Sequence, residues 1–313
     1  HRRGDTAGTT ARHRKPMTNL NLASATEAGA VGDAADAVVG WFLSNGEPFF
    51  NGLNGLILSL AELIEQLLSI PSPWLLALGV ALLALWRVGA GFSLLSLLGL
   101  NLVVAMQLWE PMVTTLSLVL AASLLALLIG LPLGVLAARQ RWVWQLTRPM
   151  LDLMQTMPAF VYLIPAVMLF STGAVPSIIA TFVFSMPPVV RLTVLGIRQV
   201  PADLIEAGRS FGCSDLQLLR KVQLPCALPT VMTGVNQTIM LALSMVVIAS
   251  MIGGGGLGDV VLRGIQQLNI GLGFEGGVAV VILAVILDRL SQSFSAPPSA
   301  SLPIRLRTLW RGR

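Results

Sequence analysis

Long apolar segments dominate the sequence and constrain its fold more than any other feature. A membrane-spanning helix needs about 20 apolar residues to cross about 30 Å of hydrocarbon. Seven candidate segments cover residues 73–90, 92–109, 112–138, 157–174, 176–198, 228–252 and 277–294. The segment 92–109 is the weakest, because Asn101 and Gln107 interrupt it. Only 11% of the residues are charged, against about 25% in soluble domains. We predict an all-α polytopic membrane protein with about seven transmembrane helices.

The distribution of Lys and Arg predicts the orientation of these spans. Basic residues without matching acids follow the third span and the last span, and more surround a polar insert at 203–225. The other side receives Glu110 and a 253–276 loop, in which one Arg faces two acids. Basic loops remain cytoplasmic as a rule. With seven spans, the N-terminus is therefore expected outside and the C-terminus in the cytoplasm.

The region before the first span has two parts of opposite charge. Residues 1–16 hold five basic residues and one acid, against the predicted orientation, and no apolar run of a signal peptide follows them. We interpret them as an upstream or foreign extension, with Met17 as a candidate start, or as a segment that is translocated regardless of its charge. Residues 17–72 hold six acids and no Lys or Arg, so they are expected to be extracytoplasmic. Their composition predicts poor order up to about Ala37.

An amphipathic helix is expected at 54–70, lying at a membrane face and packed on its own bundle. Its predicted apolar face consists of Leu56, Leu60, Leu63, Ile64 and Leu67. Its predicted polar face consists of Ser59, Glu62, Gln66 and Ser69.

The insert at 203–225 is the most polar stretch between two apolar segments. It carries six charges in 19 residues: Asp203, Glu206, Arg209, Asp215, Arg220 and Lys221. Each would cost a few kcal/mol or more at the centre of a bilayer, so the insert must face water. Its length suits a helix-turn-helix. Gly212 is a natural stop for the first helix, Ser214 or Asp215 can cap the second, and Pro225 is expected to end it.

One spacing in this insert resembles a known motif. Glu206 and Ala207 precede Gly212, nine residues follow, and then comes Val222-Gln223-Leu224-Pro225. This resembles the EAA loop of ABC-importer permeases, the coupling helix that docks in a groove of a cytoplasmic ATPase subunit. Gly208 replaces the second Ala usual in that family, and Val222 replaces the usual Ile. The resemblance implies an ATPase-coupling role for Asp203, Glu206, Ala207, Gly208, Gly212, Leu224 and Pro225.

Longer segments resemble the glycine betaine/proline betaine (ProW-type) permeases over roughly 110–293. They are Leu151–Leu163, Pro187–Thr193, Gln199–Glu206, Gly234–Ile252 and Leu262–Ile265. The resemblance implies a type I permease core at 110–294, peripheral transmembrane helices at 73–109 and a basic cytoplasmic tail at 295–313. It also implies a multi-pass protein of a bacterial inner membrane.

The resemblance further implies the partners. Two copies of the permease would pair around a central pathway in the membrane lipid, and each would receive one ATPase subunit. ATP and Mg would be bound by that ATPase, so no cofactor is expected in this chain. A substrate-binding protein would deliver the osmolyte from outside, and no nucleic acid is involved.

No catalytic or metal site is expected in the chain. Both histidines, His1 and His13, lie in the N-terminal extension, and the spacing of Cys213 and Cys226 fits no zinc or redox motif. The run Gly253–Gly258 lacks the Gly-Lys-Ser/Thr ending of a phosphate-binding loop and is expected to be a flexible link. The chain is therefore expected to be a transport subunit without an ATPase site.

Polar residues within the apolar segments are candidates for the lining of the pathway. They are Gln155, Thr156, Tyr162, Asn236, Gln237 and Ser244. Hydrogen bonding between helices is an equally good explanation for each.

Two alternatives remain open at this stage. One is an ABC permease for another small solute, such as choline, carnitine or an amino acid. The other is a channel or secondary carrier that needs no ATPase, although no span holds the buried carboxylate of a proton-coupled carrier.

Overall fold

The computed structural model describes residues 22–295, which form helices and short connections. They divide into two compact units, one up to Glu47 and one from Pro48 onward. Helix α1 (Leu22–Ser69) runs through both. The expected poor order up to Ala37 is wrong from Leu22 onward, where the alanine-rich sequence is helical. The N-terminal extension at 1–16 and most of the basic tail lie outside the described residues.

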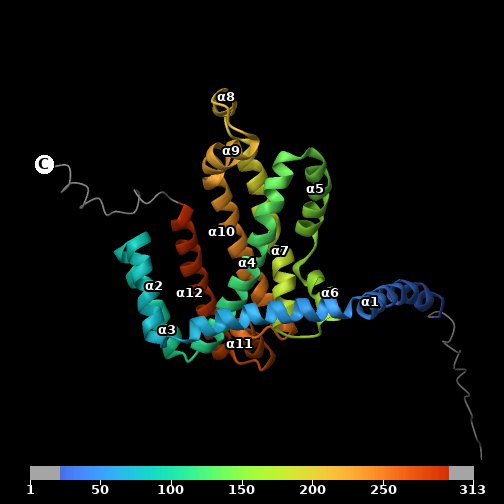
Figure 1. Ribbon diagram of the computed structural model, residues 1–313. Coiled ribbons are helices and arrows are strands. Elements are labelled where there is room, and N and C mark those ends of the chain that lie inside the picture. Colours follow the sequence, from blue (N-terminus) through green and yellow to red (C-terminus); the bar gives the residue numbers. More distant parts are fainter. Residues whose placement is uncertain (1–21, 296–313) are drawn as a thin grey trace, which may run out of the picture. The chain divides into compact units, whose positions relative to one another are not determined.

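The second unit continues from α1 with helices that run mostly back and forth (Figure 1). They are α2 (Pro73–Arg87), α3 (Ala90–Ala105), α4 (Trp109–Arg139), α5 (Arg141–Thr156), α6 (Ala159–Phe170), α7 (Ala174–Arg198), α8 (Ala202–Ser210), α9 (Asp215–Leu218), the π-helix Leu219–Gln223, α10 (Leu224–Ala249), the 3₁₀ turn Ser250–Ile252, α11 (Gly256–Gln266) and α12 (Ile270–Ser295).

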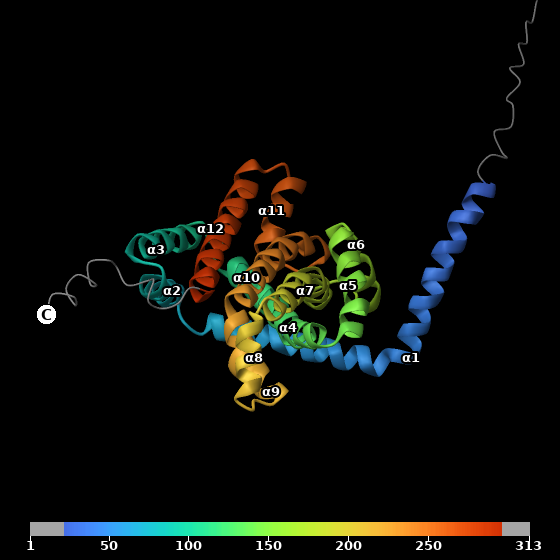
Figure 2. The same ribbon diagram turned by 90° about the horizontal axis from the view of Figure 1, so that it is seen from above.

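Helices α4, α7 and α10 pack together at the centre of this unit, as the view from above shows (Figure 2). Small residues allow their backbones to approach closely. A Cβ atom added at Gly134 of α4 would lie 2.7 Å from Cβ of Thr193, and one at Gly234 of α10 would lie 3.1 Å from Cα of Val189. Helices α5 and α6 pack on one side of these three helices. The hairpin of α2 and α3 packs with α12 on the other side (Figure 2). The three central helices therefore form one tightly packed body.

The long helices coincide with four of the seven predicted spans. Trp109–Arg139, Ala174–Arg198, Asp215–Ile252 and Ile270–Phe294 are long and apolar enough to cross a membrane. The predicted span 157–174 contains α6, which has 12 residues and meets α5 at a bend of 103°. In the predicted spans 73–90 and 92–109 the helices have 15 and 16 residues. Length and composition thus support four spans, or up to six if each bent pair counts as one.

The part of α1 from Pro48 onward packs on the core with only part of the predicted face, through Leu60 and Ile64. Ile57 and Ala61 are buried, whereas Leu56, Leu63 and Leu67 are 59–67% exposed. Glu65, on the packed side, accepts a hydrogen bond from Oγ1 of Thr114 at 2.7 Å. The sequence pattern selected the leucines because of their hydrophobicity. The helix instead turns Ile57 and Ala61 into the core and leaves Leu56, Leu63 and Leu67 outside it.

The glycine-rich run after α10 is a packed turn, so the expected flexible link is wrong. Gly253, Gly255 and Gly256 have positive φ, and a Cβ atom at Gly256 would lie 2.4 Å from Oγ1 of Thr115. That hydroxyl also accepts a hydrogen bond from the N–H of Leu257 at 2.7 Å. Glycine is therefore required here for left-handed backbone and close contact. The expected 253–276 loop also contains α11, at the end of the unit opposite α8 (Figure 1).

Candidate coupling segment and pathway residues

The polar insert folds into two helical limbs at one end of the unit, beyond α4, α7 and α10 (Figure 1). The first limb is α8, and its end follows the prediction. Gly212 has φ +76°, its N–H donates to the carbonyl of Arg209, and the N–H of Cys213 donates to the carbonyl of Gly208. These two bonds form a Schellman motif, which satisfies the last carbonyls of the helix.

Ser214, one of the two predicted candidates, caps the second limb. Its hydroxyl accepts a hydrogen bond from the N–H of Gln217, and its own N–H donates to Oε1 of Gln217 at 3.0 Å. This is a complete capping box, which satisfies donors at both ends of the first turn.

The predicted stop at Pro225 is wrong. The second limb passes through the π-helix Leu219–Gln223 into α10 and is continuous from Asp215 to Ile252. Pro225 lies in the first turn of α10, where a missing N–H costs little. The N–H of Leu224 donates to the carbonyl of Leu219, five residues earlier. This wider turn shifts the hydrogen-bond register just before the proline, so the helix can continue.

The two limbs pack on each other through Gly208. A Cβ atom at this position would lie 2.7 Å from Cδ1 of Leu218, which is buried. An alanine here, as in the related motif, would require the leucine tip to shift. Because Leu218 and Leu219 anchor the second limb beneath the first, the insert is one structural piece joined directly to α10.

The predicted coupling residues lie on this piece but have different surroundings. Asp203, Glu206 and Ala207 are exposed on α8. Gly208 and Gly212 have the structural roles described above, and Leu224 and Pro225 open α10.

Sequence reasoning missed three apolar side chains that this segment presents to water. Phe211 is 90% exposed, Leu216 is 51% exposed and Leu204 is 44% exposed. Single exposed apolar residues are common, but three on one short polar segment indicate a contact surface. The signal in the sequence was available: Phe211 is an aromatic residue at the tip of a charged helix-turn-helix.

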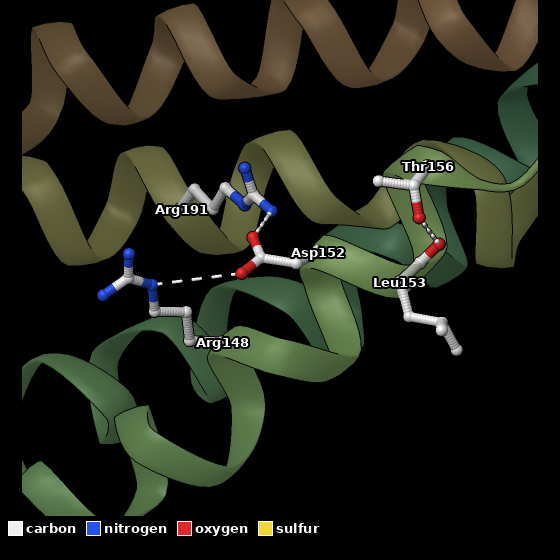
Figure 3. A network of polar contacts seen from close by, with 5 residues as sticks. All are labelled: Arg148, Asp152, Leu153, Thr156 and Arg191. Atoms are coloured by element: carbon white, nitrogen blue, oxygen red, sulfur yellow. Dashed lines mark hydrogen bonds and ion pairs between the residues drawn. The ribbon is translucent and has the colours of Figure 1, made fainter.

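An ion-pair network fastens the end of α5 to α7 near the bend between α5 and α6 (Figure 3). Asp152 accepts a hydrogen bond from Nη2 of Arg191 on α7, and Nε of Arg148 lies 3.9 Å from its other oxygen. Asp152 and Arg191 are 39 positions apart in the sequence, and no sequence pattern predicted that they pair. The side chain of Asp152 is 53% exposed, so water weakens the pair. The network fixes geometry more than it adds stability.

The six predicted pathway residues do not gather in one place. Gln155 and Thr156 are exposed at the end of α5, where Oγ1 of Thr156 donates to the carbonyl of Leu153 (Figure 3). Tyr162 is 7% exposed, donates to the carbonyl of Met154 and packs edge-on against Phe184. Its contacts are those of a residue that stabilises the bend.

The three candidates on α10 also differ from one another. Asn236 accepts a hydrogen bond from the hydroxyl of Ser291 on α12, which is an interhelical contact. Gln237 and Ser244 are exposed seven residues apart, on one face of the helix. Of the six residues, these two, with Gln155 and Thr156, present polar groups away from the packed core.

Comparison with known proteins identifies the architecture. A family described as binding-protein-dependent transport system inner membrane component matches residues 130–295. The glycine betaine/proline betaine transport system permease protein ProW of Escherichia coli (strain K12) is 52% identical over 257 residues, covering 82% of this chain and 72% of that protein. The glycine betaine transport system permease protein OpuAB of Bacillus subtilis (strain 168) is 47% identical over 262 residues, covering 83% of this chain and 93% of that protein.

A solved structure shares the fold at low sequence identity. A chain of the MetNI methionine ABC transporter, in an inward-facing conformation, superposes with a TM-score of 0.54 at 22% identity. The match covers 61% of this chain and 94% of that chain.

Proposed function

The chain belongs to the family of binding-protein-dependent transport system inner membrane components, and on this premise we propose that it is the permease subunit of an ATP-driven importer of glycine betaine and proline betaine. The single observation that carries the substrate class is the 52% identity to a relative that bears this name. The relatives are permease subunits, so ATP and Mg are assigned to a separate ATPase. A second copy of the permease and an extracytoplasmic binding protein complete the proposed transporter.

The insert at 203–225, the coupling segment, is the proposed docking element for the ATPase. Its exposed Arg209 and Phe211 are of residue types that are enriched in protein interfaces, and Glu206 is exposed on the same helix as Arg209. The packing of Gly208 on Leu218 supports the view that both limbs move as one piece.

Movement of the segment would pass directly into the central helices. The helix from Asp215 to Ile252 is continuous, so a force on the second limb acts along α10. Gly234 brings α10 within contact distance of α7, and Gly134 of α4 does the same from the other side of α7. Packed interiors resist compression, so these three helices would tilt together.

The pathway is proposed to run along the exposed polar face of α10, marked by Gln237 and Ser244. The proposed orientation places the N-terminus outside and the C-terminus in the cytoplasm of a bacterial inner membrane. The charges at the two ends of the unit support this orientation. Arg139 and Arg198 are the last residues of α4 and α7, at the end that holds α8, whereas Glu110 lies in the first turn of α4 at the opposite end (Figure 1).

Co-purification with the candidate ATPase and binding protein tests the proposal. The complex in nanodiscs should hydrolyse ATP faster when the glycine betaine-loaded binding protein is added. Choline, carnitine and an amino acid serve as comparison solutes, because they separate the betaine assignment from other permeases of this class. An ATPase that never binds the permease, or hydrolysis indifferent to every solute, would contradict the proposal.

A further inference from the structure

Two adjoining cavities lie at the end of the helices next to the coupling segment. The first, of about 550 Å³, is lined by residues from α4, α5 and α7. The second, of about 340 Å³, lies between the ends of α4 and α7 and the two limbs of the segment. Both cavities are lined by Ala138, Arg139 and Arg198, so they share one wall, and together they are called the recess.

The recess is strongly basic. Arg139, Arg141, Arg198 and Arg209 line it, and Asp215 is the one acidic residue in its lining. Among the carboxylates whose side chains the structure describes, none lies within ion-pair distance of any of the four arginines. Four guanidinium groups around one hollow repel each other, so the recess attracts an anion with several acceptor oxygens.

Part of the recess is already ordered. Arg198 donates from Nη2 to the carbonyl of Ala137 at 2.9 Å, and its guanidinium lies 5.3 Å from the ring centroid of Trp144. These contacts hold one cation in place before any ligand binds. Side chains that are already ordered lose less entropy on binding.

The surroundings indicate where the anion comes from. On α5, Trp142, Leu146, Met150 and Leu153 form an exposed apolar stripe, each at least 60% exposed. Arg141 and Gln145 of the same helix line the recess. Trp142 lies in the first turn of α5, and Trp is typical of the boundary between acyl chains and headgroups.

We propose that this recess binds the phosphate group of an anionic phospholipid whose acyl chains lie along the apolar stripe of α5. Basic pockets between transmembrane helices on the cytoplasmic side bind such headgroups. The assignment to the cytoplasmic leaflet rests on the orientation given in the proposed function. The presence of the basic recess does not depend on that orientation. Because the arginines connect the coupling segment with the ends of α4 and α7, a bound headgroup would fix the distance between them.

Lipid retention by the full chain tests this site without any transport measurement. The protein is placed in nanodiscs of equal parts phosphatidylglycerol and phosphatidylcholine, extracted in mild detergent, and its bound lipid is measured by native mass spectrometry. The test variant is Arg139→Gln/Arg141→Gln, which removes no hydrogen bond to a described residue. The control is Arg220→Gln/Lys221→Gln, which makes the same change of charge at exposed positions outside the recess.

The wild type should retain phosphatidylglycerol in preference to phosphatidylcholine. Each arginine near a surface contributes a factor of about five, so the test variant should lose about 25-fold in this preference. The control should keep the wild-type preference. Equal losses in both variants, or no loss in either, would overturn the site.

A second arm separates lipid from a soluble anion. The lipid-free protein in detergent is titrated with inorganic phosphate, and no saturable binding is expected in the low millimolar range. Saturable phosphate binding that the test variant abolishes would overturn the assignment to lipid. Retention that disappears when the ATPase subunit is added would do the same, because an acidic side chain of that partner would then occupy the recess.

Discussion

Phe211 offers the sharpest test of the coupling segment, because its side chain is 90% exposed at the tip of the turn. Replacing it with alanine removes almost no intramolecular packing, so the free energy of unfolding should change by less than about 0.5 kcal/mol. If the ring enters a groove of the ATPase, its burial there contributes about 1.5–3 kcal/mol. Phe211→Ala should therefore weaken binding of the ATPase roughly 10- to 150-fold.

The measurement is the dissociation constant of the purified permease and ATPase, with the permease held in nanodiscs. Phe274→Ala is the matched control. Phe274 is 71% exposed near the start of α12, at the end of the unit opposite the coupling segment. It should leave the dissociation constant unchanged, and thermal unfolding of both variants should match the wild type.

An unchanged dissociation constant for Phe211→Ala would refute the reasoning that this exposed ring is an anchor. Equal weakening by both variants would also refute it, since the effect would then be unrelated to position.

Further predictions concern the coupling turn, the glycine-rich turn and the ion-pair network. Glu206→Lys and Gly212→Pro should each abolish betaine uptake while membrane insertion, measured by fractionation, persists; normal uptake by either variant would count against coupling. Gly256→Ala should lower the free energy of unfolding by about 2–5 kcal/mol in a thermal unfolding assay, because the residue has positive φ and its Cβ atom would clash. Gly277→Ala, where a Cβ atom would meet open space, should leave the free energy of unfolding unchanged in the same assay. Asp152→Asn should change the free energy of unfolding by no more than about 1 kcal/mol, because water reaches the ion pair. A larger loss would show that the network is a main source of stability.

Features set by local chemistry were predictable from the sequence. The stop at Gly212 and the cap at Ser214 depend on a few neighbouring residues, and both predictions were confirmed. The long apolar helices α4, α7, α10 and α12 were also expected, because burial in hydrocarbon requires such runs.

Features set by distant contacts were not predictable in this way. Pro225 does not end its helix, because the preceding π-turn shifts the hydrogen-bond register. Gly256 packs closely on Thr115 and Gly254 on Ser177, yet composition alone cannot distinguish that use from flexibility. The pairing of Asp152 with Arg191 depends on how α5 folds back along α7, which no local pattern encodes.

The candidate site shows the same division. The motif at Glu206 and Gly212 indicated the proposed coupling segment, but it said nothing about Phe211 or about the arginine recess beneath the segment. Arginines from four separate helices, α4, α5, α7 and α8, line that recess, so only the assembled fold reveals it.

Uptake of radiolabelled glycine betaine into proteoliposomes tests the central claim most directly. The permease is reconstituted with its ATPase and binding protein, and ATP is either supplied to the side of the ATPase or omitted. The account predicts accumulation against a gradient with ATP and none without it. Equal accumulation in ATP-free vesicles would contradict the account and favour a channel or secondary carrier.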